Sequence, residues 1–156
     1  MRFTDEPELG GVRYRAYLAS VSERLPARLK AFALQDWYYD PNDHRCPHDS
    51  WLEQLTIDEP SNGERKEQRS ITIRLRLLAP YHDGEILFAH CDVRQYRLET
   101  PSEYKSPPYG VGHGDFLRDE IRMLEDGFIE HDITFSRGSR FVIECGDIEF
   151  EFRSKS

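Results

Sequence analysis

Three polar residues in the second half of the chain have side chains suited to acid/base chemistry: His90, Asp119 and His131. A carboxylate that accepts a hydrogen bond from an imidazole orients the ring and raises its basicity, so such a pair can move protons inside a cavity. Whether the three residues meet depends on the register of the strands that carry them.

The register follows from turns that end in glycine. A three-residue loop with Gly127 in the left-handed conformation pairs Ile121 with His131. The same register pairs Asp119 with Ile133, so Asp119 and His131 become diagonal neighbours on an otherwise apolar face. The next turn ends in Gly138, and the same loop length keeps that face consistent on the following strand.

His90 belongs to an earlier hairpin. A four-residue loop there pairs Leu75 with His90, which also points this imidazole inward. We therefore predict His90, Asp119 and His131 as cavity residues. The alternative is a structural hydrogen-bonded pair of Asp119 with His131, because an unpaired buried polar group costs about 1–3 kcal/mol. No nucleophile or oxyanion donor accompanies them, so the sequence assigns no catalytic residue.

The stretch "NDHRCPHDSW" (residues 42–51) places His44, Cys46 and His48 at alternate positions. Zinc binds imidazole and thiolate, but structural zinc sites usually have two ligand clusters joined by a longer span, and a second cluster is missing. Turn chemistry before and at Pro47 accounts for most of the segment. We interpret it as a polar loop and predict no metal site.

The preceding residues combine aromatic rings with negative charge. Tyr38, Tyr39, Asp40 and Asp43 offer rigid contact area beside carboxylates, which is typical of an interface for a basic partner. We predict these four as partner-binding residues. The alternative is that the rings cap the core beneath the helices, and we expect this for Trp37.

A glycine-rich segment, "YGVGHGD" (residues 109–115), contains a G-x-G-x-G pattern. It lacks the Lys-Ser/Thr ending of a phosphate-binding loop and does not follow a clear strand. We therefore predict no nucleotide and no other cofactor.

The elements that position these residues form an α+β domain. Apolar spacings of three and four predict helices over about residues 12–34, interrupted where Pro26 suits a helix start. Alternating patterns predict a sheet over about residues 51–153. We expect a single domain, residues 1–156, in which an N-terminal helical pair packs on a curved, mainly antiparallel sheet, open or as a partly closed barrel.

Composition restricts the class of protein. The formal charge of −8 opposes binding to nucleic acids and to anionic membrane surfaces, and no apolar run reaches the roughly 20 residues of a membrane span. Three widely spaced cysteines fit a reducing compartment better than a disulfide framework, so we expect a cytoplasmic protein. The sequence gives no indication of the oligomeric state.

Two functional hypotheses follow. The first is a small interaction module without catalysis, which binds a protein partner through the acidic and aromatic surface. In general character, as a compact acidic α+β domain without cofactor motifs, the chain resembles bacterial immunity proteins and adaptors. The second is an enzyme or small-molecule-binding protein with a cavity lined by His90, Asp119 and His131.

Overall fold

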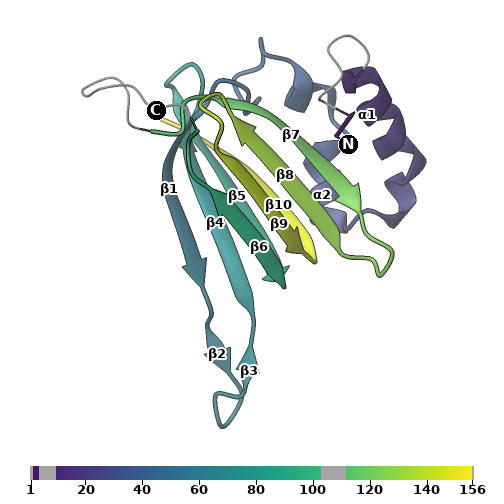
Figure 1. Cartoon of the computed structure of the whole chain (residues 1–156), viewed down its shortest axis with the longest axis vertical. Coiled ribbons are helices and arrows are strands. Elements are labelled where there is room, and N and C mark those ends of the chain that lie inside the picture. The colour runs from purple at the N-terminus through teal and green to yellow at the C-terminus, as the bar shows by residue number, and fades with distance from the viewer. Residues whose placement is uncertain (1, 4–9, 103–111, 156) are drawn as a thin grey trace.

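The computed structural model describes residues 2–3, 10–102 and 112–155. Within these ranges it contains two α-helices and three antiparallel sheets, so the predicted α+β class is confirmed (Figure 1). The helices are α1 (Gly10–Ser20) and α2 (Ala27–Ala33). The strands are β1 (Trp51–Asp58), β2 (Ser61–Asn62), β3 (Gln68–Arg69), β4 (Ile71–Leu78), β5 (Gly84–Val93), β6 (Gln95–Glu99), β7 (Phe116–Met123), β8 (Ile129–Phe135), β9 (Arg140–Cys145) and β10 (Asp147–Ser154).

The two larger sheets are halves of one bent arrangement. One has the order β1-β4-β5-β10 and the other β6-β9-β8-β7. Strand β5 continues into β6 through Arg94, while β9 continues into β10 through Gly146. The two continuous segments pair with each other in both sheets. The described residues form no closed barrel. The buried face changes phase at Gly146, since Cys145 and Ile148 are both buried on either side of it.

The hydrophobic core lies between the sheets and the helices. Alternating residues of β4 (Ile73, Leu75 and Leu77) are fully buried, as the sequence pattern predicts. Phe88 of β5 stacks on Phe116 of β7 with ring centroids 6.2 Å apart, which brings the two sheets into direct contact.

Helix α1 covers the free edge of β7. The hydroxyl of Tyr14 accepts a hydrogen bond from the backbone N–H of Ile121 (2.7 Å), and that of Tyr17 accepts one from Met123 (2.8 Å). An uncovered edge strand exposes unpaired N–H groups that invite pairing with another chain. The two tyrosines therefore both dock α1 and satisfy this edge.

Helix α2 depends on a carboxylate from the sheet. Pro26 precedes its first residue and makes no side-chain cap, so the first N–H groups have no local acceptor. Asp147 at the start of β10 accepts hydrogen bonds from the N–H groups of Leu29 (3.0 Å) and Arg28 (3.4 Å). The negative charge also suits the positive end of the helix dipole.

The register of the C-terminal hairpins agrees with the sequence argument. His131 pairs with both Ile121 and Ile143, and Asp119 pairs with Ile133. Gly127 and Gly138 have φ of +88° and +94°, the left-handed conformation that the three-residue loops require.

The register predicted for His90 is wrong by two residues. His90 pairs with Ile73, and Leu75 pairs with Phe88. Pro80 has no N–H to donate to the ladder, so the last ladder bond runs from Ala79 N to Gly84 O at 3.0 Å. The four-residue loop therefore begins one position earlier than expected. A shift of two residues keeps the same face, so His90 is still buried.

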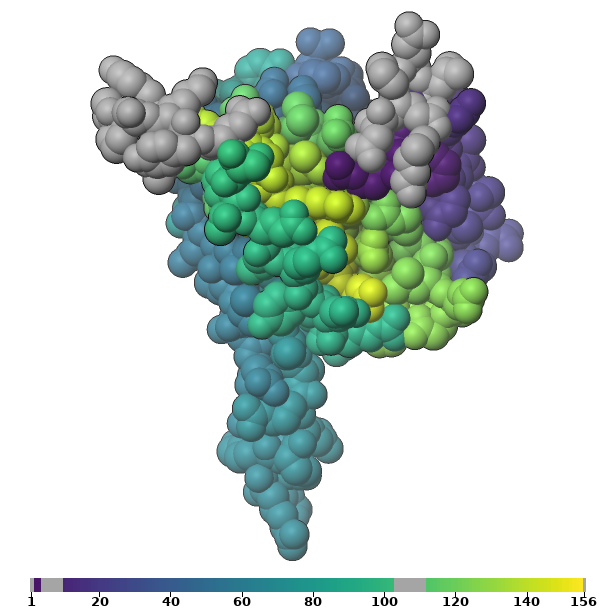
Figure 2. Space-filling model, in the orientation of Figure 1, coloured from purple at the N-terminus to yellow at the C-terminus, as the bar shows by residue number. Residues whose placement is uncertain are grey.

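Strands β2 and β3 form a short hairpin at the far end of β1 and β4. It projects away from the rest of the molecule as a narrow arm (Figures 1 and 2). These residues are hydrophilic and lack alternation, so no local pattern marks the two short strands.

We expect Tyr14→Phe to lower the free energy of unfolding by about 1–3 kcal/mol, because it leaves the buried N–H of Ile121 without an acceptor. Tyr17→Phe should cost less, since Met123 is only partly buried. Urea denaturation measures both. Tyr81→Phe, which removes an exposed hydroxyl bonded to Pro41 O, is the control. Equal losses in all three variants would contradict the role given to α1.

Candidate functional site

The cavity residues predicted from the sequence form one line of hydrogen bonds across the molecule. His90 Nε2 lies 2.9 Å from His131 Nδ1, and His131 Nε2 lies 2.7 Å from Asp119 Oδ2. At the inner end, His90 Nδ1 lies 3.2 Å from the carbonyl oxygen of Ile73. Both imidazoles are fully buried, and the side chain of Asp119 is 8% exposed. The line thus joins β4 and β5 of one sheet to β8 and β7 of the other.

The number of protons on this line follows from its ends. The carbonyl of Ile73 can only accept, so His90 Nδ1 carries a hydrogen. Burial, and then the neighbouring charge of His131, lower the pKa of His90 to about 3, so this ring is neutral and its Nε2 accepts from His131. Three hydrogen bonds need three protons, and two neutral imidazoles supply two. The third proton is shared by His131 Nε2 and Asp119 Oδ2, which makes this pair neutral overall.

Tyr38 completes the outer end of the line. Its hydroxyl donates to Asp119 Oδ2 at 2.7 Å, so this oxygen accepts from both Tyr38 and His131. Tyr38 sits in a 3₁₀ turn (Asp36–Tyr39), and its side chain packs against Phe32 and Phe150. It is 3% exposed, which does not fit the prediction that it contacts a partner. The sequence could not distinguish a buried tyrosine bonded to Asp119 from a surface tyrosine that contacts a partner, because no local pattern marks the distant carboxylate.

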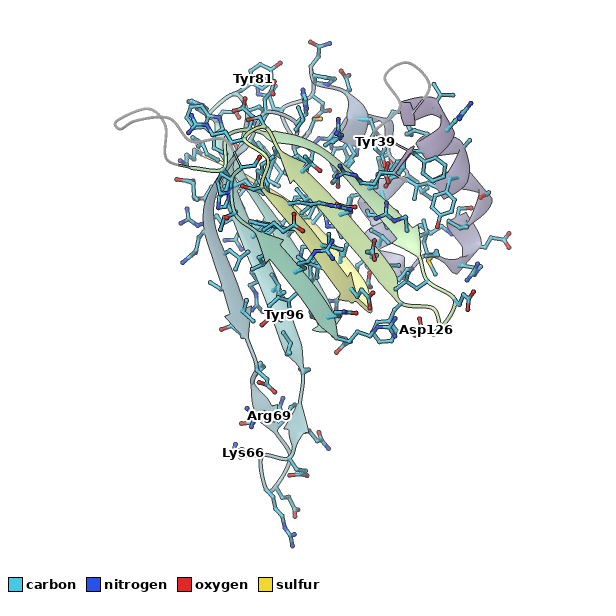
Figure 3. All side chains as sticks on the ribbon, in the orientation of Figure 1. Tyr39, Lys66, Arg69, Tyr81, Tyr96 and Asp126 are labelled. Atoms are coloured by element: carbon cyan, nitrogen blue, oxygen red, sulfur yellow. The ribbon has the colours of Figure 1, made fainter. Side chains whose placement is uncertain are left out.

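The other three predicted partner-binding residues lie nearer the surface. Tyr39 is half-buried, donates its hydroxyl to the carbonyl of Ala33 (2.6 Å) and lies beside α1 (Figure 3). Asp43 forms a salt bridge with Arg45 at 2.8 Å, which lowers the pKa of its carboxyl to about 2. Asp40 is exposed and accepts a hydrogen bond from the N–H of Asn42 (3.0 Å). The aspartates therefore hold local turns.

A pocket of about 260 Å³ opens beside Asp119. Residues from α1, from the 3₁₀ turn and the loop after it, and from β7 line it. They are Gly11, Tyr14, Arg15, Tyr38, Tyr39, Pro41, Cys46, Pro47, His48, Phe116, Leu117, Arg118 and Asp119. The lining is mainly rings and aliphatic carbon. His90 and His131 do not reach the pocket; they lie behind Asp119.

The segment "NDHRCPHDSW" forms one wall of this pocket. Cys46 is buried and donates its Sγ–H to the carbonyl of Tyr38 (3.0 Å), while His48 Nδ1 donates to the carbonyl of Leu117 (2.8 Å). His44 points elsewhere, stacks on Tyr81 and bonds to Asp83. The three candidate ligands therefore do not converge. Among the described residues, His, Cys, Asp and Glu side chains form no group of three that could hold a metal ion.

Sequence reasoning missed most of the pocket lining. Tyr14 belongs to the apolar stripe of α1, and Phe116 and Leu117 read as ordinary strand residues. No local pattern marks these residues as pocket residues, because the pocket forms only where α1, the 3₁₀ turn with the loop after it, and β7 pack together. In the glycine pattern, residues 109–111 lie outside the described residues, whereas Gly112 and Gly114 are described.

Comparison of the chain with protein-family models gives no match, and comparisons with curated proteins and with solved structures give no significant match. Within residues 10–102 and 112–155, neither helix has the length and apolar character that a membrane span requires.

We expect acid to destabilise the protein in a range set by His90. Its pKa is about 3 in the folded chain and 6.5 ordinarily, so between these values the unfolded chain binds a proton that the folded ring does not. The free energy of unfolding should therefore fall as pH decreases below 6.5. Burial lowers the pKa of His113 too, which adds in the same direction.

Urea denaturation at several pH values above 3.8 separates this effect from that of Asp132, whose pKa is lowered from 3.8 to about 2. His90→Gln should reduce the pH dependence in that range, and His44→Gln controls for loss of an exposed histidine. A wild-type stability that stays constant from pH 6.5 to 3.8 would show that His90 is not held neutral.

Proposed function

We propose that the protein binds a small organic molecule in the pocket beside Asp119. The observation that carries this proposal is the position of Asp119, which both lines the pocket and ends the buried line of hydrogen bonds through His131 and His90. Ligand sites are typically concave and mostly apolar, with a few polar groups held firmly in place. This pocket has that composition, and its carboxylate, Asp119, is held in place by hydrogen bonds from Tyr38 and His131.

The size and lining favour a compact ligand. A volume of about 260 Å³ lies just below the usual range of about 300–1,000 Å³ for drug-sized ligands, which suits a molecule built around a single ring. The half-buried Tyr39 and the exposed Leu117 are the apolar lining residues most accessible to such a ring.

Binding without reaction is favoured over catalysis. Asp119 Oδ2 already accepts two hydrogen bonds, from Tyr38 and His131, so this oxygen is occupied within the protein. The thiol of Cys46 lines the pocket, but burial raises its pKa to about 11, so it is not a ready nucleophile. Binding through Asp119 needs neither group to react.

The interaction hypothesis stays a prediction, as does a cytoplasmic location. With Tyr38 in the core, the surface available for a basic partner is reduced to Tyr39, Asp40 and Asp43. Asp43 is already paired with Arg45, which also lies over the ring of Trp37 (4.3 Å). No contact among these residues points to a partner, so the pocket is the better supported site.

Gly11→Phe should block the pocket. Gly11 lines it, and a Cβ there meets nothing within 4 Å, so the larger side chain can be accommodated without strain against the backbone. We expect single-ring aromatic fragments to shift the amide NMR signals of Leu117 and Asp119 in the wild type, and to lose this effect in Gly11→Phe.

Val12→Phe is the matched control, because Val12 is the next residue of α1, is 69% exposed and does not line the pocket. It should bind fragments like the wild type. The proposal would be refuted if no fragment shifted these signals, or if Gly11→Phe bound as well as Val12→Phe.

A further inference from the structure

We propose that the ligand is an uncharged molecule with a flat apolar body and one hydrogen-bond donor, such as a phenolic hydroxyl, which donates to Oδ1 of Asp119. This inference rests on the proposed function and specifies the class of ligand. It follows from which polar atoms around the pocket already have partners and from the charges that border it.

The hydroxyls of the three tyrosines that line the pocket are already hydrogen-bonded within the protein. Tyr38 donates to Asp119, and Tyr39 donates to the carbonyl of Ala33. Tyr14 accepts from the N–H of Ile121 and is hydrogen-bonded to Tyr39. A ligand therefore gains ring and apolar contacts from these side chains.

The second carboxylate oxygen of Asp119 is different. Both hydrogen bonds to this side chain end on Oδ2, and Oδ1 accepts none from the residues that the structure describes. The side chain is 8% exposed and borders the pocket, so Oδ1 is open to a molecule bound there. An acceptor without a protein donor can take a hydrogen bond from a ligand O–H or N–H while Oδ2 keeps both of its own bonds.

The charge balance argues against an ionic ligand. Because Asp119 and His131 share one proton and are neutral together, the pocket holds no uncompensated negative charge for an organic cation. Arg15 and Arg118 border the pocket and would repel a cation further. The same arginines would attract a carboxylate ligand, but its charge would face the acceptor oxygen of Asp119, and Arg15 is already paired with Asp36 at 2.7 Å. A neutral donor avoids both the repulsion of a cation by the arginines and the repulsion of an anion by the acceptor oxygen of Asp119.

The test uses four compounds with the same ring and different head groups: phenol, toluene, benzoate and benzylamine. Phenol and toluene have nearly the same shape, so their difference measures the donor alone. At pH 7 benzoate is an anion and benzylamine is a cation. We expect NMR titration of the wild type to show phenol binding about tenfold more tightly than toluene, from a hydrogen bond to a charged acceptor. The two ions should bind more weakly than phenol.

Asp119→Asn tests the atom. The amide keeps the shape and can still accept from Tyr38 and His131 through its oxygen, which directs its NH₂ group to the pocket. The preference for phenol over toluene should then be clearly reduced, because this NH₂ group can only donate a neutral hydrogen bond to the phenolic oxygen. Because this variant alters the buried hydrogen bonds, its amide spectrum is compared with that of the wild type, and Val12→Phe serves as a surface control that should keep the preference.

The outcomes are distinct. Equal binding of phenol and toluene, or tightest binding of benzoate or benzylamine, would overturn the ligand class and leave the pocket as a binding site. A phenol preference of full size in Asp119→Asn would show that another group accepts the donor, because a neutral bond from the amide NH₂ to the phenolic oxygen is weaker than one to a carboxylate. Failure of all four compounds to shift the signals of Leu117 and Asp119 would overturn the proposed function together with this inference.

Discussion

The buried line of hydrogen bonds from His90 through His131 and Asp119 to Tyr38 is the interaction on which the arrangement of the molecule depends. It crosses from one sheet to the other and ends in the turn that follows the helices. Polar groups in a core are costly unless each has a partner, and here each link supplies the partner of the next. Loss of one member would leave its neighbours unsatisfied, so the line specifies how three layers fit together.

The bend in the sheet makes this line possible. Strand β5 passes into β6 and β9 into β10, and the two continuous segments remain paired on both sides of the bend. As a result, His90 on one sheet and His131 on the other face each other across the core. The helices then close one side: α1 satisfies the edge of β7, while Asp147 of β10 satisfies the start of α2. Secondary structure and tertiary contacts are therefore mutually dependent at both helices.

The pocket exists because the segments around Asp119 are held by their own hydrogen bonds. Cys46 and His48 bond to backbone carbonyls, and the hydroxyls of Tyr38 and Tyr39 bond within the protein. These bonds hold the loop of Cys46 and His48 and the rings of Tyr38 and Tyr39 in fixed positions around the pocket. The same bonds leave Asp119 as the residue with an acceptor atom still available, which is why the chemistry of the site centres on it.

The sequence by itself determined the class of the fold and the buried face of the C-terminal strands. Loop length, glycine position and alternation act over a few residues, so they correctly placed Asp119 and His131 together. Local patterns failed where the outcome depends on distant packing. They shifted the hairpin at Pro80, assigned Tyr38 to a surface and gave no sign of the pocket. Only the tertiary structure decided these features, because each arises where segments far apart in the chain meet and compete for the same hydrogen-bond partners and the same space.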